Sequence, residues 1–155
     1  MSRWPGHGKH GKTTFGNLSR SALMSRIRSS RNATTELKLL LLFRAKRLIG
    51  WRRDYPLPGK PDFVFPTARL AVFVDGCFWH GHHCGRNLTP TRNALAWREK
   101  ITNNQRRDHR TNRTLRALGW RVVRIWECAL AKQRGICVRR IRRALNTARS
   151  EAPRR

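Results

Sequence analysis

A short apolar run that leads directly into a cluster of cysteine and histidine residues constrains the fold of this chain more than any other feature. The run LAVFVDG, residues 70–76, predicts a β-strand that ends in Asp75 and Gly76. The next nine residues, CFWHGHHCG, contain two cysteines, three histidines and two large aromatic residues. The end of this strand therefore brings metal-ligating, titratable and aromatic side chains together. Any fold for this chain has to accommodate this group of side chains at the end of the strand.

The charge of the chain indicates a polyanionic partner. Its 155 residues, enough for one domain with a core, include 35 Lys and Arg but only 8 Asp and Glu, a formal net charge of +27. A folded domain with so much charge of one sign repels itself unless a polyanion neutralises it. Nucleic acid is the predicted partner, ahead of an anionic membrane surface.

The sequence predicts neither a membrane span nor a secretory signal. A span needs about 20 consecutive apolar residues, and no apolar segment follows the basic N-terminus. We therefore expect a cytoplasmic protein associated with the bacterial nucleoid. In a reducing cytosol, cysteines clustered beside histidines indicate a metal site more than disulfides.

The remaining pattern predicts an α/β fold with a mixed sheet flanked by helices. The expected domain spans residues 20–149, between a flexible basic arm at 1–19 and a disordered basic tail at 150–155. Its elements, in the order α-β-β-α-β-α, are a helix from Thr34 or Thr35 to Gly50, strands at 62–66 and 69–76, one or two basic helices within 91–119, a strand at 120–128 and a helix at 138–149.

The cysteine and histidine cluster predicts a zinc site. Three ligands of the kind that Zn²⁺ takes in tetrahedral sites stand in one loop, namely Cys77, His82 and Cys84. Cys128 is the first choice for the fourth ligand, because the strand at 120–128 would end beside the strand at 69–76. Cys137 and His83 are the alternatives. The spacing matches no common zinc finger, so the cysteines could instead be ordinary buried residues.

Two of the few acidic residues stand at predicted strand ends. Asp62 opens the strand DFVFP and Asp75 closes the next one. Carboxylates at neighbouring strand ends suit a hard cation such as Mg²⁺, which in a nuclease activates water and offsets charge on the phosphate. The alternative is that Asp62 only forms a salt bridge with an arginine at a turn.

Four motifs, taken together, resemble those of the very-short-patch-repair (Vsr) DNA mismatch endonucleases. They are LPGKPDFVFP, VFVDGCFWHGHHC, W-x-x-K-I and LGWRVVRIWECAL, and the resemblance covers about residues 20–131. It implies a restriction-endonuclease-like core with a structural zinc. It also implies Mg²⁺-dependent nicking of double-stranded DNA on the 5′ side of the T in a T:G mismatch left by deamination of 5-methylcytosine. We expect a monomer whose product is passed to mismatch-repair and repair-polymerase proteins.

The resemblance assigns chemistry to particular residues. Asp62 matches the metal-binding aspartate, the carbonyl of Val74 a second Mg²⁺ contact, and His80 the catalytic histidine. Glu36 matches a supporting acidic residue, although an exposed helix-start glutamate would look the same. Asp75 stands where some members have a second active-site histidine; a carboxylate could bind Mg²⁺ through water but could not donate a proton at neutral pH.

The resemblance also assigns the zinc site and the contacts that distort DNA. Cys77, His82, Cys84 and Cys128 match the zinc ligands. The aromatic residues wedged into the duplex match Phe78, Trp79 and Trp97, and Met24 matches an arm residue that inserts from the opposite groove. Trp97 could instead be a core residue, and His80 could replace His82 as a ligand.

Two other functions remain open. The same core could belong to a nuclease with another site preference, or the chain could be a non-catalytic, zinc-stabilised basic DNA-binding module.

Overall fold

The computed structural model describes residues 33–85 and 93–150. The predicted arm at 1–19, Met24 and the last five residues of the predicted tail lie outside these ranges. The described elements are α2 (Ala33–Ala45), β1 (Phe63–Phe65), β2 (Leu70–Asp75), α3 (Ala94–Ala117), β3 (Arg121–Trp126), α4 (Glu127–Lys132) and α5 (Arg134–Ser150). Within the described ranges, no helix combines the length and apolar character needed to cross a membrane.

The three strands form one mixed sheet in the order β1-β2-β3, which confirms the predicted α/β class with a mixed sheet. β1 and β2 are antiparallel, with Phe63 opposite Val72. β2 and β3 are parallel, and Asp75 lies opposite Trp126 at their ends. Because parallel strands end at the same edge, the residues that follow β2 and β3 meet there, as expected.

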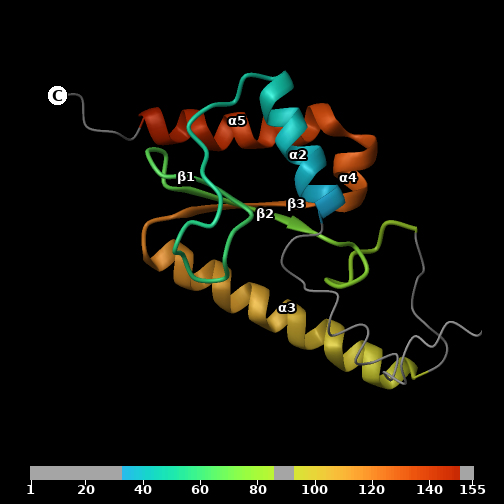
Figure 1. Cartoon of the computed structure of the whole chain (residues 1–155). Coiled ribbons are helices and arrows are strands. Elements are labelled where there is room, and N and C mark those ends of the chain that lie inside the picture. The colour runs from blue at the N-terminus through green and yellow to red at the C-terminus, as the bar shows by residue number, and fades with distance from the viewer. Residues whose placement is uncertain (1–32, 86–92, 151–155) are drawn as a thin grey trace, which may run out of the picture. The chain divides into compact units, whose positions relative to one another are not determined.

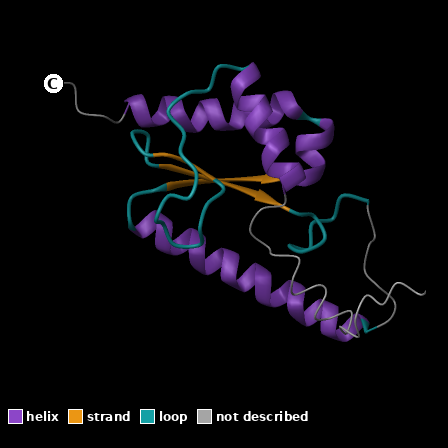
Figure 2. Cartoon of the chain, viewed as in Figure 1, coloured by secondary structure: helices purple, strands orange, loops and turns teal. Residues whose placement is uncertain are grey.

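Helices cover both faces of the sheet. Figures 1 and 2 show α2, α4 and α5 on one face and the long α3 on the other. The larger core lies on the first face and includes Phe43, Phe63, Val72, Ile125 and Ile141. The core beneath α3 is smaller and is formed by Ala71, Phe73 and Leu115. The sparse packing under α3 leaves much of its inner side available for polar contacts.

Several predicted boundaries were wrong by a few residues. α2 ends at Ala45 rather than Gly50, because Arg47 adopts a positive φ of 50° and the chain turns. Leu48 still returns to the core, and its N–H donates to the carbonyl of Phe43 at 2.9 Å. α5 begins at Arg134, before the predicted start at 138.

The helical segment agrees with the prediction of one or two helices, and the segment after β3 differs from it. α3 is one helix of 24 residues. β3 ends at Trp126, so Cys128 lies in the first turn of α4 rather than at the end of a strand. This short helix was not predicted, because six residues are too few for a hydrophobic period to be visible.

Candidate active site and metal centre

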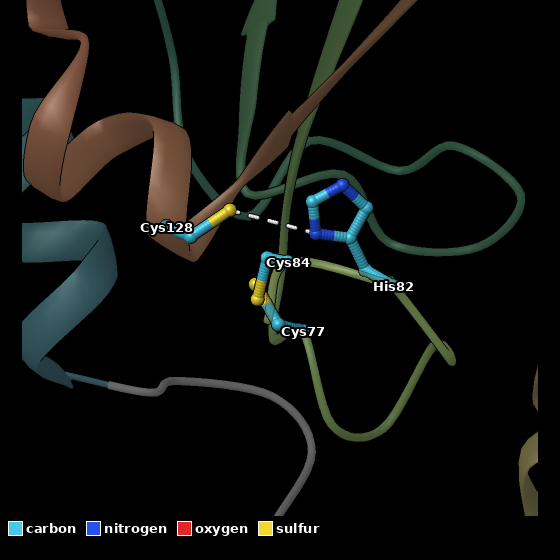
Figure 3. Close-up of side chains that lie close together, drawn as sticks. All are labelled: Cys77, His82, Cys84 and Cys128. Atoms are coloured by element: carbon cyan, nitrogen blue, oxygen red, sulfur yellow. Dashed lines mark hydrogen bonds between the residues drawn. The ribbon is translucent and has the colours of Figure 1, made fainter. Parts of the chain in front are cut away.

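Four side chains at the common end of β2 and β3 form a compact group of metal ligands. Cys77, His82, Cys84 and Cys128 offer one ligand atom each, and these atoms all lie within 4.8 Å of one another. Figure 3 shows the four side chains converging, with Nδ1 of His82 at 3.5 Å from Sγ of Cys128. Three cysteines and one histidine form a donor set that suits tetrahedral Zn²⁺.

The surroundings of the cluster hold its ligands in place. The N–H of His82 donates to the carbonyl of Cys77 at 2.9 Å. The ring of His82 stacks on Trp126, with centroids 4.2 Å apart and planes at 10°. Burial, together with hydrogen bonds to Cys128 and Cys84, raises the pKa of the Cys77 thiol to about 12. Thiols ionise when they bind a metal. The convergence of three cysteines and one histidine within 4.8 Å is what fits a zinc ion.

The alternative zinc ligands lie elsewhere. Cys137 stands on α5 and is buried in the larger core, and His83 is exposed to solvent. His80 lies outside the four-residue group and points its Nδ1 at Asp108. The geometry therefore agrees with the first choice made from the sequence, in which Cys128 completes the set.

The carboxylates of Asp62, Glu36 and Asp75 lie close to one another near the end of β2. Asp62 precedes β1, and one of its oxygens accepts a hydrogen bond of 2.7 Å from the N–H of Val74. Burial is the main reason that the pKa of Asp62 rises to about 7, with further contributions from the neighbouring carboxylates of Glu36 and Asp75. Asp62 is thus a carboxyl group in surroundings that disfavour its negative charge.

The three carboxylates have different partners. Glu36 is buried in the first turn of α2 and forms an ion pair with Arg53, so it is not an exposed helix-start residue. Asp75 forms an ion pair with Arg124. In the described part of the chain, the contacts found for Asp62 are the Val74 N–H and the Glu36 carboxyl, not an arginine. A crowded, desolvated carboxylate without a cationic partner fits a hard divalent cation such as Mg²⁺.

His80 is oriented by an acidic residue that the sequence did not single out. Its Nδ1 forms a hydrogen bond with Oδ2 of Asp108 on α3, and its Nε2 lies 3.8 Å from Oδ1 of Asp75. Burial alone would raise the pKa of Asp108, but the hydrogen bond and charge of His80, together with Arg124 and Arg107, lower it overall. Asp108 therefore stays ionised and holds the ring.

α3 fixes the loop after β2 through a row of polar side chains. Asn104 donates to the carbonyl of Trp79 at 2.9 Å, and Gln105 donates to that of His80 at 3.1 Å. Asn104, Asp108 and Asn112 are spaced four residues apart and therefore share one side of the helix. This spacing was the available signal for Asp108, but polar rows at helical spacing usually mark a solvated surface.

The three predicted DNA-wedging aromatic residues lie together. The ring centroid of Phe78 is 5.1 Å from that of Trp79 and 5.3 Å from that of Trp97, and the two tryptophans are 5.8 Å apart. All three are partly exposed, and Lys100 lies over both indole rings at 5.5 and 5.6 Å. Trp97 is therefore part of a surface aromatic cluster rather than a core residue.

A hollow of about 350 Å³ lies beside the carboxylates. Its lining includes Glu36 and Asp62, together with the basic residues Arg53 and Lys60. Arg53 and Lys60 were not singled out from the sequence, because the chain contains many basic residues. Their position beside a candidate cation site suits them for contact with an anionic group such as a phosphate.

Comparison with known proteins identifies the family. The sequence profile of the family described as DNA mismatch endonuclease Vsr matches residues 13–86. The DNA mismatch endonuclease Vsr of Escherichia coli strain K12 is 42% identical over 102 residues, which is 66% of this chain and 65% of that protein.

Two relatives are covered more completely. The type II nicking enzyme V.XorIIP of Xanthomonas oryzae pv. oryzae is 42% identical over 115 residues, 72% of this chain and 82% of that enzyme. The type II nicking enzyme V.NmeAIP of Neisseria meningitidis serogroup A is 36% identical over 132 residues, 83% and 91% of the two chains. The chain belongs to the Vsr DNA mismatch endonuclease family, and by family it is a DNA-nicking hydrolase.

Proposed function

We propose that this chain is a Mg²⁺-dependent endonuclease that nicks duplex DNA on the 5′ side of the T in a T:G mismatch, on a restriction-endonuclease-like core. The observation that carries the proposal is that Asp62 and His80 both lie close to Asp75 at the end of β2. Phe78 and Trp79 of the partly exposed aromatic cluster belong to the same loop as His80. Family membership supports the hydrolytic reaction. Family membership does not decide the mismatch preference, since the relatives of this chain include both a mismatch endonuclease and type II nicking enzymes.

In this proposal Asp62 and the backbone carbonyl of Val74 bind the cation, and Glu36 supports Asp62 from α2. Magnesium, when bound there, supplies an activated water and offsets the charge that develops on the phosphate. His80 faces the reacting groups with Nε2, while Asp108 holds its Nδ1 and so determines which nitrogen exchanges a proton. Asp75 lies beside His80, with one oxygen 3.8 Å from Nε2.

The zinc site acts as a scaffold for the catalytic loop. Cys77 and His82 flank the segment that contains Phe78, Trp79 and His80. Zinc, when bound, links this loop to Cys128 on α4 and restricts its motion. Hydrolysis depends on the alignment of the reacting groups. A loop that zinc holds at Cys77 and at His82 would keep His80 in a fixed position relative to Asp62.

The cluster of Phe78, Trp79 and Trp97 provides the mismatch preference. Separating a base step costs a few kcal/mol, and inserted side chains recover this by stacking and by bending the duplex. A mismatched pair is easier to open than a matched one, so the same wedge acts more readily there. Lys100, which lies over the two indole rings, is placed to contact a nearby phosphate.

A nicking assay on a panel of duplexes tests the proposal. One strand of each duplex carries an end label, and the panel contains T:G, C:G, T:A and other mismatches in several flanking sequences. We expect cleavage of the T:G duplex, in the strand that contains the mismatched T and on the 5′ side of that T. This cleavage should require Mg²⁺. The D62N variant should bind the T:G duplex but nick it at least about 100-fold more slowly.

Each part of the proposal has a result that would contradict it. Equal nicking of T:G and C:G duplexes would exclude mismatch specificity and leave a site-specific nicking enzyme. Full activity of D62N would remove Asp62 from the cation site. Salt-dependent binding with no cleavage of any duplex would leave a zinc-stabilised DNA-binding module.

A further inference from the structure

Arg124 occupies the centre of a polar network between the sheet and α3. It stands on β3 opposite Phe73 of β2, and its guanidinium lies over the Phe73 ring at 4.7 Å. The side chain is only 18% exposed. In a protein with so many surface arginines, a largely buried one over an aromatic ring has a specific structural position.

All three nitrogens of the guanidinium have partners. Nε donates to Oδ2 of Asp75 at 2.6 Å and Nη2 donates to Oδ1 of the same carboxylate at 2.9 Å. Nη2 also lies 2.9 Å from Oδ1 of Asp108, and Nη1 donates to Oδ1 of Asn112 at 3.1 Å. One side chain thus joins β2, β3 and α3 beside the candidate active site.

These contacts determine what Asp75 can do. Its side chain is 3% exposed, and both of its oxygens accept hydrogen bonds from Arg124. A two-pronged contact of this kind fixes the plane of the carboxylate and neutralises its charge. Asp75 is therefore committed to Arg124, whereas the nearby Asp62 is not paired in this way.

The same contacts extend to His80. Asp108 uses Oδ1 for Arg124 and Oδ2 for Nδ1 of His80, so its carboxylate bridges the two side chains. With Arg124 in place, Asp108 cannot rotate without breaking an ion pair. The orientation of the His80 ring thus depends on a residue that does not touch it.

We propose that Arg124 is a positioning residue of this endonuclease, and that Asp75 acts through Arg124 and not as a ligand of the cation. Arg124 holds Asp75 and Asp108 on either side of His80, and Asp108 sets the direction of the imidazole. This inference rests on the proposed nicking activity, but its structural part applies equally to the protein without DNA.

The first test measures nicking by R124M and R124K. With Mg²⁺ and duplex both saturating, we expect R124M to nick about 10- to 100-fold more slowly than the wild type, while its affinity for the duplex changes by less than about threefold. R124K keeps the positive charge but cannot form the two-pronged contact, so its nicking rate should lie between those of R124M and the wild type. R139M, which removes an exposed arginine from α5, controls for the lost charge and should keep the wild-type rate.

The second test is a double-mutant cycle. If Asp75 acts through Arg124, the D75N/R124M double variant should nick no more slowly than R124M alone. The concentration of Mg²⁺ that gives half of the maximal rate should be unchanged in D75N. Rate losses that multiply in the double variant, or a higher Mg²⁺ requirement in D75N, would show that Asp75 acts independently and overturn the proposal.

A third measurement needs neither DNA nor activity. We expect the imidazole NMR resonances of His80 to shift and broaden in R124K, while those of the exposed His109 on α3 stay in place. Unchanged His80 resonances, or wild-type nicking by R124M, would refute the positioning role. A wild-type protein that cuts no duplex would instead refute the proposed function, and the His80 spectra would still decide whether Arg124 orients the ring.

Discussion

As the proposed ligand of a divalent cation, Asp62 faces two opposing demands. A metal ligand has to be ionised, yet burial and the neighbouring carboxylates raise the pKa of Asp62 to about 7. The hydrogen bond from Val74 favours the ionised form but does not outweigh them. Ionisation of a carboxyl group in these surroundings lowers the stability of the fold, but the carboxylate is suited to binding a divalent cation. Such raised pKa values are common at functional sites.

This conflict predicts a pH-dependent stability. The folded protein binds the Asp62 proton more tightly than the unfolded chain, whose Asp pKa is 3.8. Stability without Mg²⁺ should therefore decrease as pH rises from about 4 to about 7, by an amount on the order of a few kcal/mol. D62N should show a smaller decrease and exceed the wild type in stability at pH 8. Urea unfolding at several pH values checks this, and a parallel pH dependence in both proteins would contradict it.

Asp108 should matter for rate and not for binding. D108N loses the charge that holds His80, and its amide could present either a donor or an acceptor to the ring. We expect nicking to slow by about 10- to 100-fold with little change in duplex affinity. E99Q removes the same charge from an exposed position of α3 and should behave as the wild type. Weaker binding by D108N, with an unchanged maximal rate, would place Asp108 in DNA binding instead.

At the scale of elements, the loop after β2 depends on close contact with α3. Gly81 adopts a φ of 65°, and a Cβ there would lie 2.6 Å from Nε2 of Gln105 and 2.8 Å from Cγ2 of Ile101. A side chain at this position would therefore push the loop away from the helix that holds the backbone of Trp79 and His80.

Replacement of Gly81 should uncouple the loop from the helix. G81A should destabilise the protein by about 1–3 kcal/mol and lower nicking more than it lowers duplex binding. G50A is the matched control, because Gly50 has a φ of 84° but a Cβ there would have no other atom within 4 Å. Its cost should be the backbone strain alone, about 1–2 kcal/mol, with normal nicking. Equal activity of the two variants would argue against a role for this contact.

The proposed zinc site would link the loop after β2 to α4, and variants of two cysteines distinguish this role from core packing. C128S should lose the metal, measured as about one zinc per chain in the wild type, because a hydroxyl is a poor replacement for a thiolate. C137S should keep its metal but lose stability, since it places a hydroxyl in the larger core. Zinc content measured on the purified variants distinguishes them. Loss of zinc from C137S, with full zinc in C128S, would contradict the assignment.

At the scale of the whole molecule, the formal charge of +27 should dominate affinity without deciding specificity. A protein that contacts 6 to 10 phosphates loses roughly 10³- to 10⁵-fold in affinity between 50 and 200 mM salt. We expect a decrease of this size for T:G and matched duplexes alike, with parallel slopes, because phosphates are the same in both. Titrations at several salt concentrations test this. A ratio of the two affinities that changes steeply with salt would contradict it.

Local patterns in the sequence determined much of what was confirmed. The apolar runs around Phe63 and Val72 predicted two strands, and the spacing of cysteines and histidine predicted three neighbouring ligands. Cys128 followed from the expectation that two strands end at one edge, which the parallel pairing of β2 and β3 confirms. The family also followed from contiguous motifs. These features are local or depend on the pairing of two strands, so they could be predicted from the sequence.

Only the tertiary structure decided which distant side chains meet. The sequence could not indicate that Asp108 contacts His80, or that Arg124 pairs with Asp75, 49 residues away. Both depend on how α3 lies across the sheet, where Leu115 packs in a small core and Asp108 and Asn112 contact Arg124. Among 35 basic residues, nothing in the sequence distinguishes Arg124 from a solvated one. Burial distinguishes it, because a charge removed from water has to find a partner, and burial is a property of the folded chain.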